Sequence, residues 1–282
     1  MLRFGIFTNP EKDASLSATR KVLQAIKDAG CEVCLDDQTA AFLGIEDFTD
    51  AMYSDVLFIL GGDGTILRAV HKYVKYGILF AGINIGHLGF MSEIGIAEID
   101  AFISLLMHKK YVVDERSMLE ASISSQIDGQ KKRVIALNDF VVTRRNRMNI
   151  IHLNLYINGT LAENYQGDGI ILATPTGSTA YSLSAGGPIV SPNMDCMIVT
   201  PICPHSLYAR SIVTKNSDIL EVEPYACDGD MYVAGDGANT LELHENDRIT
   251  IKVSDTTAKF VRSSADSFFP LLKSKLAQWD ND

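Results

Sequence analysis

A continuous apolar run at positions 56–60 ends abruptly in the sequence Gly-Gly-Asp-Gly-Thr at 61–65. A run this short and this apolar is typical of a β-strand that is buried on both faces. Ile66, Val70 and Val74 then follow at helical spacing. A buried strand, a tight glycine-rich turn and a helix form the start of a βαβ unit. The chain is therefore restricted to folds that contain a parallel sheet.

The first third of the chain repeats this alternation of strand and helix. Apolar runs and helical patterns alternate with turn signals, as expected for a parallel sheet covered by helices. The expected strands are 2–7, 31–35, 56–60 and 78–83, and the expected helices are 16–30, which Gly30 terminates, 66–74 and 99–107.

The pattern changes near Arg116, where short alternating strands replace the helices. Residues 151–157 alternate apolar and polar side chains, and Asn158-Gly159 then has the residues of a two-residue type I′ hairpin turn. Asp128-Gly129 marks a second expected hairpin. Further strands are expected at 170–173, 197–200, 219–222, 231–234 and 249–253, and a final helix at 268–278. We therefore expect α/β plus all-β organisation, with an α/β domain at 1–115, an all-β domain at 116–265, and a tail segment at 266–282 that packs back on the first domain.

Charge and cysteine content limit the possible partners. With 25 basic and 35 acidic residues the net charge is −10, which argues against binding nucleic acid or an anionic membrane. No apolar run approaches the roughly 18–20 residues of a membrane span, and the first residues lack the features of a signal peptide. The five cysteines are scattered and odd in number, unlike a disulfide framework. We expect a cytoplasmic protein without nucleic-acid or membrane partners.

The glycine-rich turn at 61–65 is a candidate phosphate site. Glycines permit positive φ and close approach of a ligand, and amides at a helix N-terminus hold phosphate oxygens. Asp63 is unusual there because a carboxylate repels phosphate. It is expected either to bind Mg²⁺ or to accept a proton from a nucleophilic hydroxyl. The alternative is that Asp63 merely caps the helix. The turn matches neither a Walker A loop nor the G-x-G-x-x-G dinucleotide motif.

A second segment, residues 174–188, is rich in small and hydroxyl-bearing residues. Such a loop offers many neutral donors and acceptors without bulk, which suits a polar ligand with a ribose or an amide. The alternative is a turn that caps a short helix near Ser178. This segment by itself does not decide between the two.

Taken in order, residues 61–65, Asn138-Asp139 and 174–188 resemble the NAD kinase family, and residues 84–90 are similar to its next loop. The resemblance covers nearly the whole chain. The glycine-aspartate motif is weakly specific, because phosphofructokinases and diacylglycerol-type lipid kinases have close versions. The Thr-Pro-Thr-Gly-Ser-Thr-Ala-Tyr string at 174–181 is much more specific. The resemblance implies a Rossmann-like first domain, a β-sandwich-type second domain, and transfer of the ATP γ-phosphoryl group to the 2′-hydroxyl of the NAD adenosine ribose.

The resemblance also implies roles for individual residues. Asp63 would be the general base, Mg²⁺ would be bound mainly through ATP, and no direct protein ligand of the metal is assigned. The phosphate loop would be Gly61, Gly62, Gly64 and Thr65. The NAD-binding residues would be Asp63, Gly64, Arg68, Phe90, Asn138, Asp139, Gln166, Asp168, Thr176, Thr179, Ala180, Tyr181, Ser182 and Ser184. The family forms homodimers or homotetramers, and some members use polyphosphate as donor. Two positions depart from its pattern, Gln166 in place of Arg and Ala238 in place of Gln.

Other features receive simpler interpretations. Cys31 and Cys34 are three residues apart on an expected strand and point to opposite faces, so a zinc or redox site is not expected. The basic run at 144–147 is read as a solvated loop that could also attract ATP phosphates. His71 and His87, near the glycine loops, are read as surface or core histidines. The alternative functions are a lipid kinase and a non-catalytic dinucleotide sensor. The acidic balance disfavours the first, and the presence of Asp63 disfavours the second.

Overall fold

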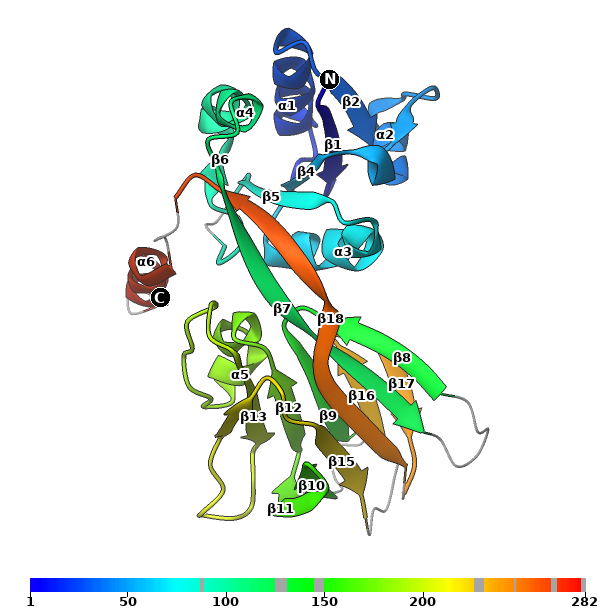
Figure 1. Ribbon diagram of the computed structural model, residues 1–282, viewed down its shortest axis with the longest axis vertical. Coiled ribbons are helices and arrows are strands. Elements are labelled where there is room, and N and C mark those ends of the chain that lie inside the picture. The colour runs from blue at the N-terminus through cyan, green and yellow to red at the C-terminus, as the bar shows by residue number, and fades with distance from the viewer. Residues whose placement is uncertain are drawn as a thin grey trace. The chain divides into compact units, whose positions relative to one another are not determined.

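The structure is a computed structural model that describes residues 1–86, 89–124, 131–144, 150–225, 231–245, 247–264 and 268–279. The chain divides into two compact units. Unit 1 contains residues 1–115 and 258–282, and unit 2 contains residues 116–257. Figure 1 labels the helices and strands of both units.

Unit 1 is built on a parallel sheet. Its strand order is β3-β2-β1-β4-β5, with β6 paired to β5. The strands are β1 (Arg3–Thr8), β2 (Glu32–Leu35), β3 (Thr49–Asp50), β4 (Val56–Leu60), β5 (Leu79–Asn84) and β6 (Ile94–Gly95). All five residues of β4 are buried, which confirms the fully buried strand that the apolar run predicts. The end of β18 (Arg248–Arg262) also pairs parallel to β5, through Lys259 and Phe260, a contact that the sequence analysis did not predict.

Helices cover both faces of this sheet (Figure 1). Val22 and Phe102, from two of these helices, share a buried core with Phe4 and Phe58 of the strands. A β-carbon at Gly82 would contact Ile66 of α3 at 2.8 Å, so α3 packs closely on the other face. The α-helices are α1 (Ser17–Asp28), α2 (Asp37–Leu43), α3 (Asp63–Tyr73), α4 (Ile99–Met107) and α6 (Phe268–Trp279). The short 3-10 turns are η1 (Ala51–Tyr53), η2 (Val74–Tyr76) and η3 (Ile96–Glu98).

Unit 2 consists mainly of antiparallel strands in two sheets. One sheet has the order β14-β13-β12-β9-β16-β17, and the other contains β11-β10-β15-β18 with β7 paired to β18 and β8. The strands not yet given are β7 (Val112–Ser124), β8 (Lys131–Ala136), β9 (Asp139–Arg144), β10 (Ile151–Ile157), β11 (Thr160–Gly167), β12 (Gly169–Ala173), β13 (Cys196–Ile202), β14 (Ile212–Lys215), β15 (Leu220–Pro224), β16 (Met231–Gly235) and β17 (Ala238–Leu243). Side chains from both sheets, such as Leu153 and Leu172, share one buried core, as in a β-sandwich.

Turn chemistry explains two hairpins of unit 2. Asn158 and Gly159 have φ of 51° and 76°, and Ile157 pairs with Thr160, which confirms the predicted type I′ hairpin. Asp236 and Gly237 have φ of 50° and 69° between the paired Gly235 and Ala238, so they form a second such turn that the sequence analysis missed. The predicted Asp128-Gly129 turn lies outside the described residues, although β7 and β8, which flank it, pair antiparallel.

The tail helix α6 groups with unit 1, and Lys275 lies over the ring of Phe90 at 5.8 Å. No helix in the described part of the chain is long and apolar enough to cross a membrane.

Candidate active site

The glycine-rich turn lies at the carboxyl end of β4, where ligands bind in open α/β sheets. Gly62 is the N-cap of α3, and Asp63 is its first helical residue. The amides of Asp63 and Gly64 are in the first turn, where N–H groups have no acceptor within the helix. The positive end of the helix macrodipole therefore faces the turn, which suits an anionic group.

The glycines of this turn differ in function. A β-carbon at Gly61 would overlap the side chain of Thr65, and the Gly61 amide donates to the Ile83 carbonyl at 3.2 Å. The expectation that this amide holds phosphate is therefore wrong, and Gly61 determines the shape of the loop. Gly62, whose φ is −98°, and Gly64 do not use the positive φ that glycine permits. A β-carbon at either would face open space, so both leave room for a ligand.

Thr65, at the end of the turn, is buried. Its hydroxyl accepts a hydrogen bond of 3.3 Å from the side chain of Asn9, which follows β1. The Thr65 amide donates to the carbonyl of Gly62. Thr65 thus ties the turn to the neighbouring strand, and its side chain supports the loop from the protein side.

The Asp63 carboxylate is held by two consecutive backbone amides. Its Oδ2 accepts from the Phe90 amide at 2.9 Å, and its Oδ1 accepts from the Met91 amide at 3.0 Å. The side chain does not cap α3, so the alternative reading of Asp63 as a helix cap is wrong. A β-carbon at Gly89 would overlap Asp63 Oδ1, which explains why glycine is needed there. Each oxygen retains a second lone pair, so this carboxylate is oriented and can still accept a proton.

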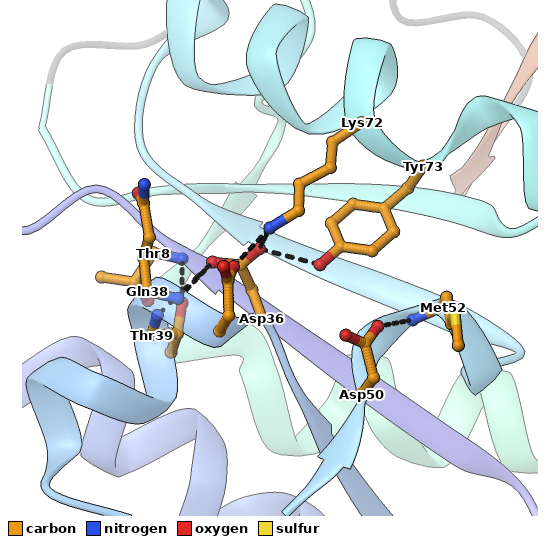
Figure 2. A network of polar contacts seen from close by, with 9 residues as sticks. Thr8, Asp36, Gln38, Thr39, Asp50, Met52, Lys72 and Tyr73 are labelled. Carbon is orange, nitrogen blue, oxygen red and sulfur yellow. Dashed lines mark hydrogen bonds and ion pairs between the residues drawn. The ribbon is translucent and has the colours of Figure 1, made fainter.

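A buried polar network anchors the far end of α3 (Figure 2). Asp36, which follows β2 and is 1% exposed, accepts from Tyr73 Oη at 2.8 Å and from Lys72 Nζ at 2.6 Å. It also caps α2 by accepting from the amides of Gln38 and Thr39. The sequence analysis missed both α2 and this network. A signal was present, since an aspartate just before a short helical stretch is a typical N-cap. The network fixes the helix that begins at Asp63.

Three segments of unit 2 meet at one end of the sheet β14-β13-β12-β9-β16-β17. The strands β9 and β12 pair antiparallel to each other, and Ala173 at the end of β12 lies opposite Asp139 at the start of β9. The residues just before β9 and just after β12 are therefore neighbours. The Thr174 amide donates to the Asn138 carbonyl at 2.8 Å. A β-carbon at Gly177 would overlap the backbone of Asn138, so the 174–177 loop packs directly on this residue. The two motifs that the sequence analysis singled out are therefore in contact.

The turn at Asp236 completes this cluster. Its carboxylate accepts from the amides of Leu137, Asn138 and Asp139, at 2.7, 2.8 and 3.1 Å. Asp139 is 5% exposed. Burial, and then the charge of Asp236, raises the pKa of Asp139 to about 7. The sequence analysis assigned Asp236 no role.

The hydroxyl-rich segment forms the turn η4 (Thr176–Thr179) and one short helical turn, α5 (Tyr181–Ser184). Tyr181 and Ser184 are exposed, and Thr179 and Ala180 are partly exposed. Thr176 is buried and accepts from Arg116 at 3.3 Å. The Ser182 hydroxyl is enclosed, 2.9 Å from the Thr200 hydroxyl. In this segment, residues 179–181 and Ser184 are therefore accessible to solvent, whereas Thr176 and Ser182 are buried beneath the surface.

Two further predicted residues lie near the start of β12. Asp168 forms an ion pair with Arg144 at 2.6 Å, so the one described residue of the basic run at 144–147 faces a carboxylate. Gln166 is exposed, and its carbonyl accepts from the His205 amide at 2.8 Å. Residues 145–147 and His87 lie outside the described residues.

A metal centre made only of protein ligands is not found in the described part of the chain, where no three His, Cys, Asp or Glu side chains cluster to hold an ion. Cys34 is buried within β2, and Cys31 lies just before that strand.

Unit 1 has a glycine-rich loop with an oriented carboxylate at the end of a parallel sheet, and unit 2 has a hydroxyl-rich loop. These features are those expected of a phosphotransferase with an alcohol acceptor. Models of the ATP-NAD kinase N-terminal and C-terminal domains match residues 4–111 and 137–263. The chain belongs to the NAD kinase family. The NAD kinase of Lachnoclostridium phytofermentans is 38% identical over 98% of this chain and 99% of its own, and that of Acetivibrio thermocellus is 40% identical over 98% and 97%.

Solved structures agree with this assignment. An NAD kinase from Archaeoglobus fulgidus in complex with ATP matches with a TM-score of 0.78 and 25% identity, over 98% of this chain and 99% of that chain. Yeast NADH kinase complexed with NADH matches with a TM-score of 0.88 over 98% of this chain and 88% of that chain. At 24% identity the second match supports the fold alone. Both confirm the expected α/β plus all-β class.

Proposed function

We propose that this chain transfers the γ-phosphoryl group of ATP to the 2′-hydroxyl of the adenosine ribose of NAD, with Asp63 as general base. The observation that carries the proposal is the Asp63 carboxylate, which two amides orient at the start of α3. Membership of the NAD kinase family supports the acceptor. The related archaeal enzyme, solved in complex with ATP, supports the donor.

Unit 1 supplies the phosphoryl-transfer residues in this proposal. The amides of Gly62, Asp63 and Gly64 bind phosphate oxygens, while Gly61 and Thr65 maintain the loop. Arg68, exposed on α3, adds a positive charge for a phosphate, and Phe90 packs beside the dinucleotide. The donor would be the Mg²⁺ complex of ATP, in which the metal would neutralise charge on the transferred group.

Unit 2 supplies the NAD-binding residues in this proposal. Asn138 and Asp139 bind polar groups of the adenosine, and Asp168 binds near the nicotinamide end. The remaining contacts are assigned to Gln166, Thr176, Thr179, Ala180, Tyr181 and Ser184. We assign Ser182 a supporting role, because its hydroxyl is buried against Thr200.

The chemistry of the step limits what Asp63 can do. A carboxylate is too weak a base to ionise a sugar hydroxyl in advance, so the proton moves late, as the new P–O bond forms. The loose transition state of phosphoryl transfer leaves most of the catalysis to positioning and electrostatics. General-base assistance contributes about 10²–10⁴ in rate.

From its membership of the NAD kinase family we also propose that the protein assembles into homodimers or homotetramers. We propose further that it is cytoplasmic and that it accepts polyphosphate as an alternative donor. Each is separable from the central reaction.

The reaction is tested by incubating purified protein with NAD and Mg-ATP and measuring NADP with an NADP-specific dehydrogenase. That readout reports phosphorylation at the 2′-position, since the 3′-isomer is not a substrate for it. Polyphosphate in place of ATP and a diacylglycerol acceptor in place of NAD are the comparison reactions. NADP formation supports the proposal. Failure to form NADP with either donor, or phosphorylation of diacylglycerol alone, contradicts it.

A further inference from the structure

The turn that holds Asp63 is closed by a buried serine. Ser92 is fully buried, and its hydroxyl accepts a hydrogen bond of 3.2 Å from the Gly89 amide. This closure presents the amides of Phe90 and Met91 side by side to the two oxygens of Asp63. The position of the carboxylate therefore depends on where the 89–92 turn lies.

The next residue, Glu93, ties this turn to a buried arginine. Arg262 Nη1 lies 2.6 Å from a carboxylate oxygen of Glu93, and Arg262 Nε donates to Asp114 at 3.1 Å. The side chain of Arg262 is 5% exposed, and those of Glu93 and Asp114 are 19% and 15% exposed. Ion pairs in such surroundings are weakly screened by solvent, and breaking one is costly because it leaves a buried charge without its partner.

The arginine itself is anchored to the parallel sheet. It is the last residue of β18, and Lys259 and Phe260 of the same strand pair with β5. Its guanidinium also lies 5.8 Å from the centre of the Phe260 ring. A chain of contacts therefore runs from the sheet through Arg262 and Glu93 to the turn that holds Asp63.

We propose that Arg262 is a positioning residue for phosphoryl transfer, acting through Glu93 to hold the 89–92 turn and thereby the Asp63 carboxylate. The inference rests on the proposed role of Asp63 as general base. Arg262 contacts neither Asp63 nor a substrate in this scheme. Its effect arises because a displacement of about 1 Å in a reacting group can cost about 10²-fold in rate.

The decisive variant is Glu93→Gln, which removes the ion pair but keeps the size of a partly exposed side chain. We expect kcat to fall by about 10- to 100-fold while KM for NAD and for ATP is unchanged. Glu93→Asp, which keeps the charge, should restore part of the loss. Arg262→Gln should lower kcat similarly if it folds. The matched control is Lys259→Gln, because Lys259 is on the same strand as Arg262. This change removes an exposed ion pair of 3.9 Å between Lys259 and Glu115 of β7.

Combining variants separates positioning from general damage. In the Asp63→Asn background, Glu93→Gln should cause no further loss of kcat, because it acts through Asp63. The inference is overturned if folded Glu93→Gln has wild-type kcat, if only KM changes, or if it lowers kcat by the same factor in both backgrounds. Wild-type turnover by the Asp63→Asn single variant would instead contradict the proposed role of Asp63 as general base. The inference about Arg262 would then fail because it rests on that role.

Discussion

The carboxylate of Asp236 accepts a hydrogen bond from the backbone amide of Asp139 at 3.1 Å, and both residues lie at the same end of the sheet β14-β13-β12-β9-β16-β17. Asp236 also accepts from two neighbouring amides, whereas the Asp139 side chain is 5% exposed. The two aspartates are therefore in different electrostatic situations. Asp236 holds the backbone of residues 137–139, whereas burial disfavours the charged form of Asp139.

This difference predicts a pH-dependent stability. Burial and the charge of Asp236 raise the pKa of Asp139 from 3.8 to about 7 in the folded protein. Between these two values the folded state holds a proton that the unfolded state releases, so this group's contribution to stability falls as pH rises and is lowest above about 7. Asp139→Asn should therefore flatten the pH dependence and raise the free energy of unfolding at pH 8 by up to about 4 kcal/mol.

Urea unfolding of the wild type and Asp139→Asn between pH 5 and pH 8 measures this effect, with the exposed Asp255→Asn as control. Parallel pH curves for the wild type and Asp139→Asn would show that Asp139 is already ionised without cost. NAD binding by Asp139→Asn should weaken in the same samples, because the proposed role of Asp139 is to contact the adenosine.

Gly89→Ala tests the close approach of the loop to Asp63. The added methyl group would overlap Asp63 Oδ1 and lie 2.6 Å from Ser92 Oγ, so the carboxylate must move. We expect kcat to fall by about 10²-fold or more. Gly86→Ala is the control from the same loop, since its β-carbon meets no described atom within 4 Å. Equal activities of these two variants would contradict the packing seen here.

Tyr73→Phe tests the network that anchors α3 (Figure 2). The substitution removes the hydrogen bond to the buried Asp36 carboxylate and should destabilise the protein by about 1.5–3 kcal/mol, the usual range for a bond to a charged group. Tyr76→Phe, three residues further on and 46% exposed, is the control. Thermal or urea unfolding gives the comparison, and a Tyr73→Phe protein as stable as its control would exclude an energetic role for this bond.

Sequence reasoning succeeded where the determinants are local. The apolar run 56–60 and the Asn158-Gly159 turn each depend on a few adjacent residues, and both are present as predicted. It also singled out residues 61–65, 138–139 and 174–188, whose functional roles stay predictions. The contacts that arrange them are non-local. One such contact is the strand register that places Ala173 opposite Asp139, and another is the ion pair between Glu93 and Arg262. Both depend on tertiary structure, which no local sequence pattern encodes.

The missed elements show the same limit. The helix α2 has only seven residues and depends on Asp36, whose side chain also serves the network with Tyr73. Asp236 and Gly237 have the residues of a type I′ turn, but the function of Asp236 appears only when three amides from another loop reach its carboxylate. Propensity indicates where a chain turns, whereas the role of a turn depends on what packs against it.

The most direct test of the account is the rate of NADP formation by Asp63→Asn, measured beside its affinity for NAD. Asp100→Asn is the matched control, because Asp100 lies in the first turn of α4 as Asp63 does in α3. The account predicts that Asp63→Asn lowers kcat by at least about 10²–10⁴ while NAD still binds, and that Asp100→Asn is unaffected. Near-normal turnover by folded Asp63→Asn would contradict the assignment of Asp63 as the general base.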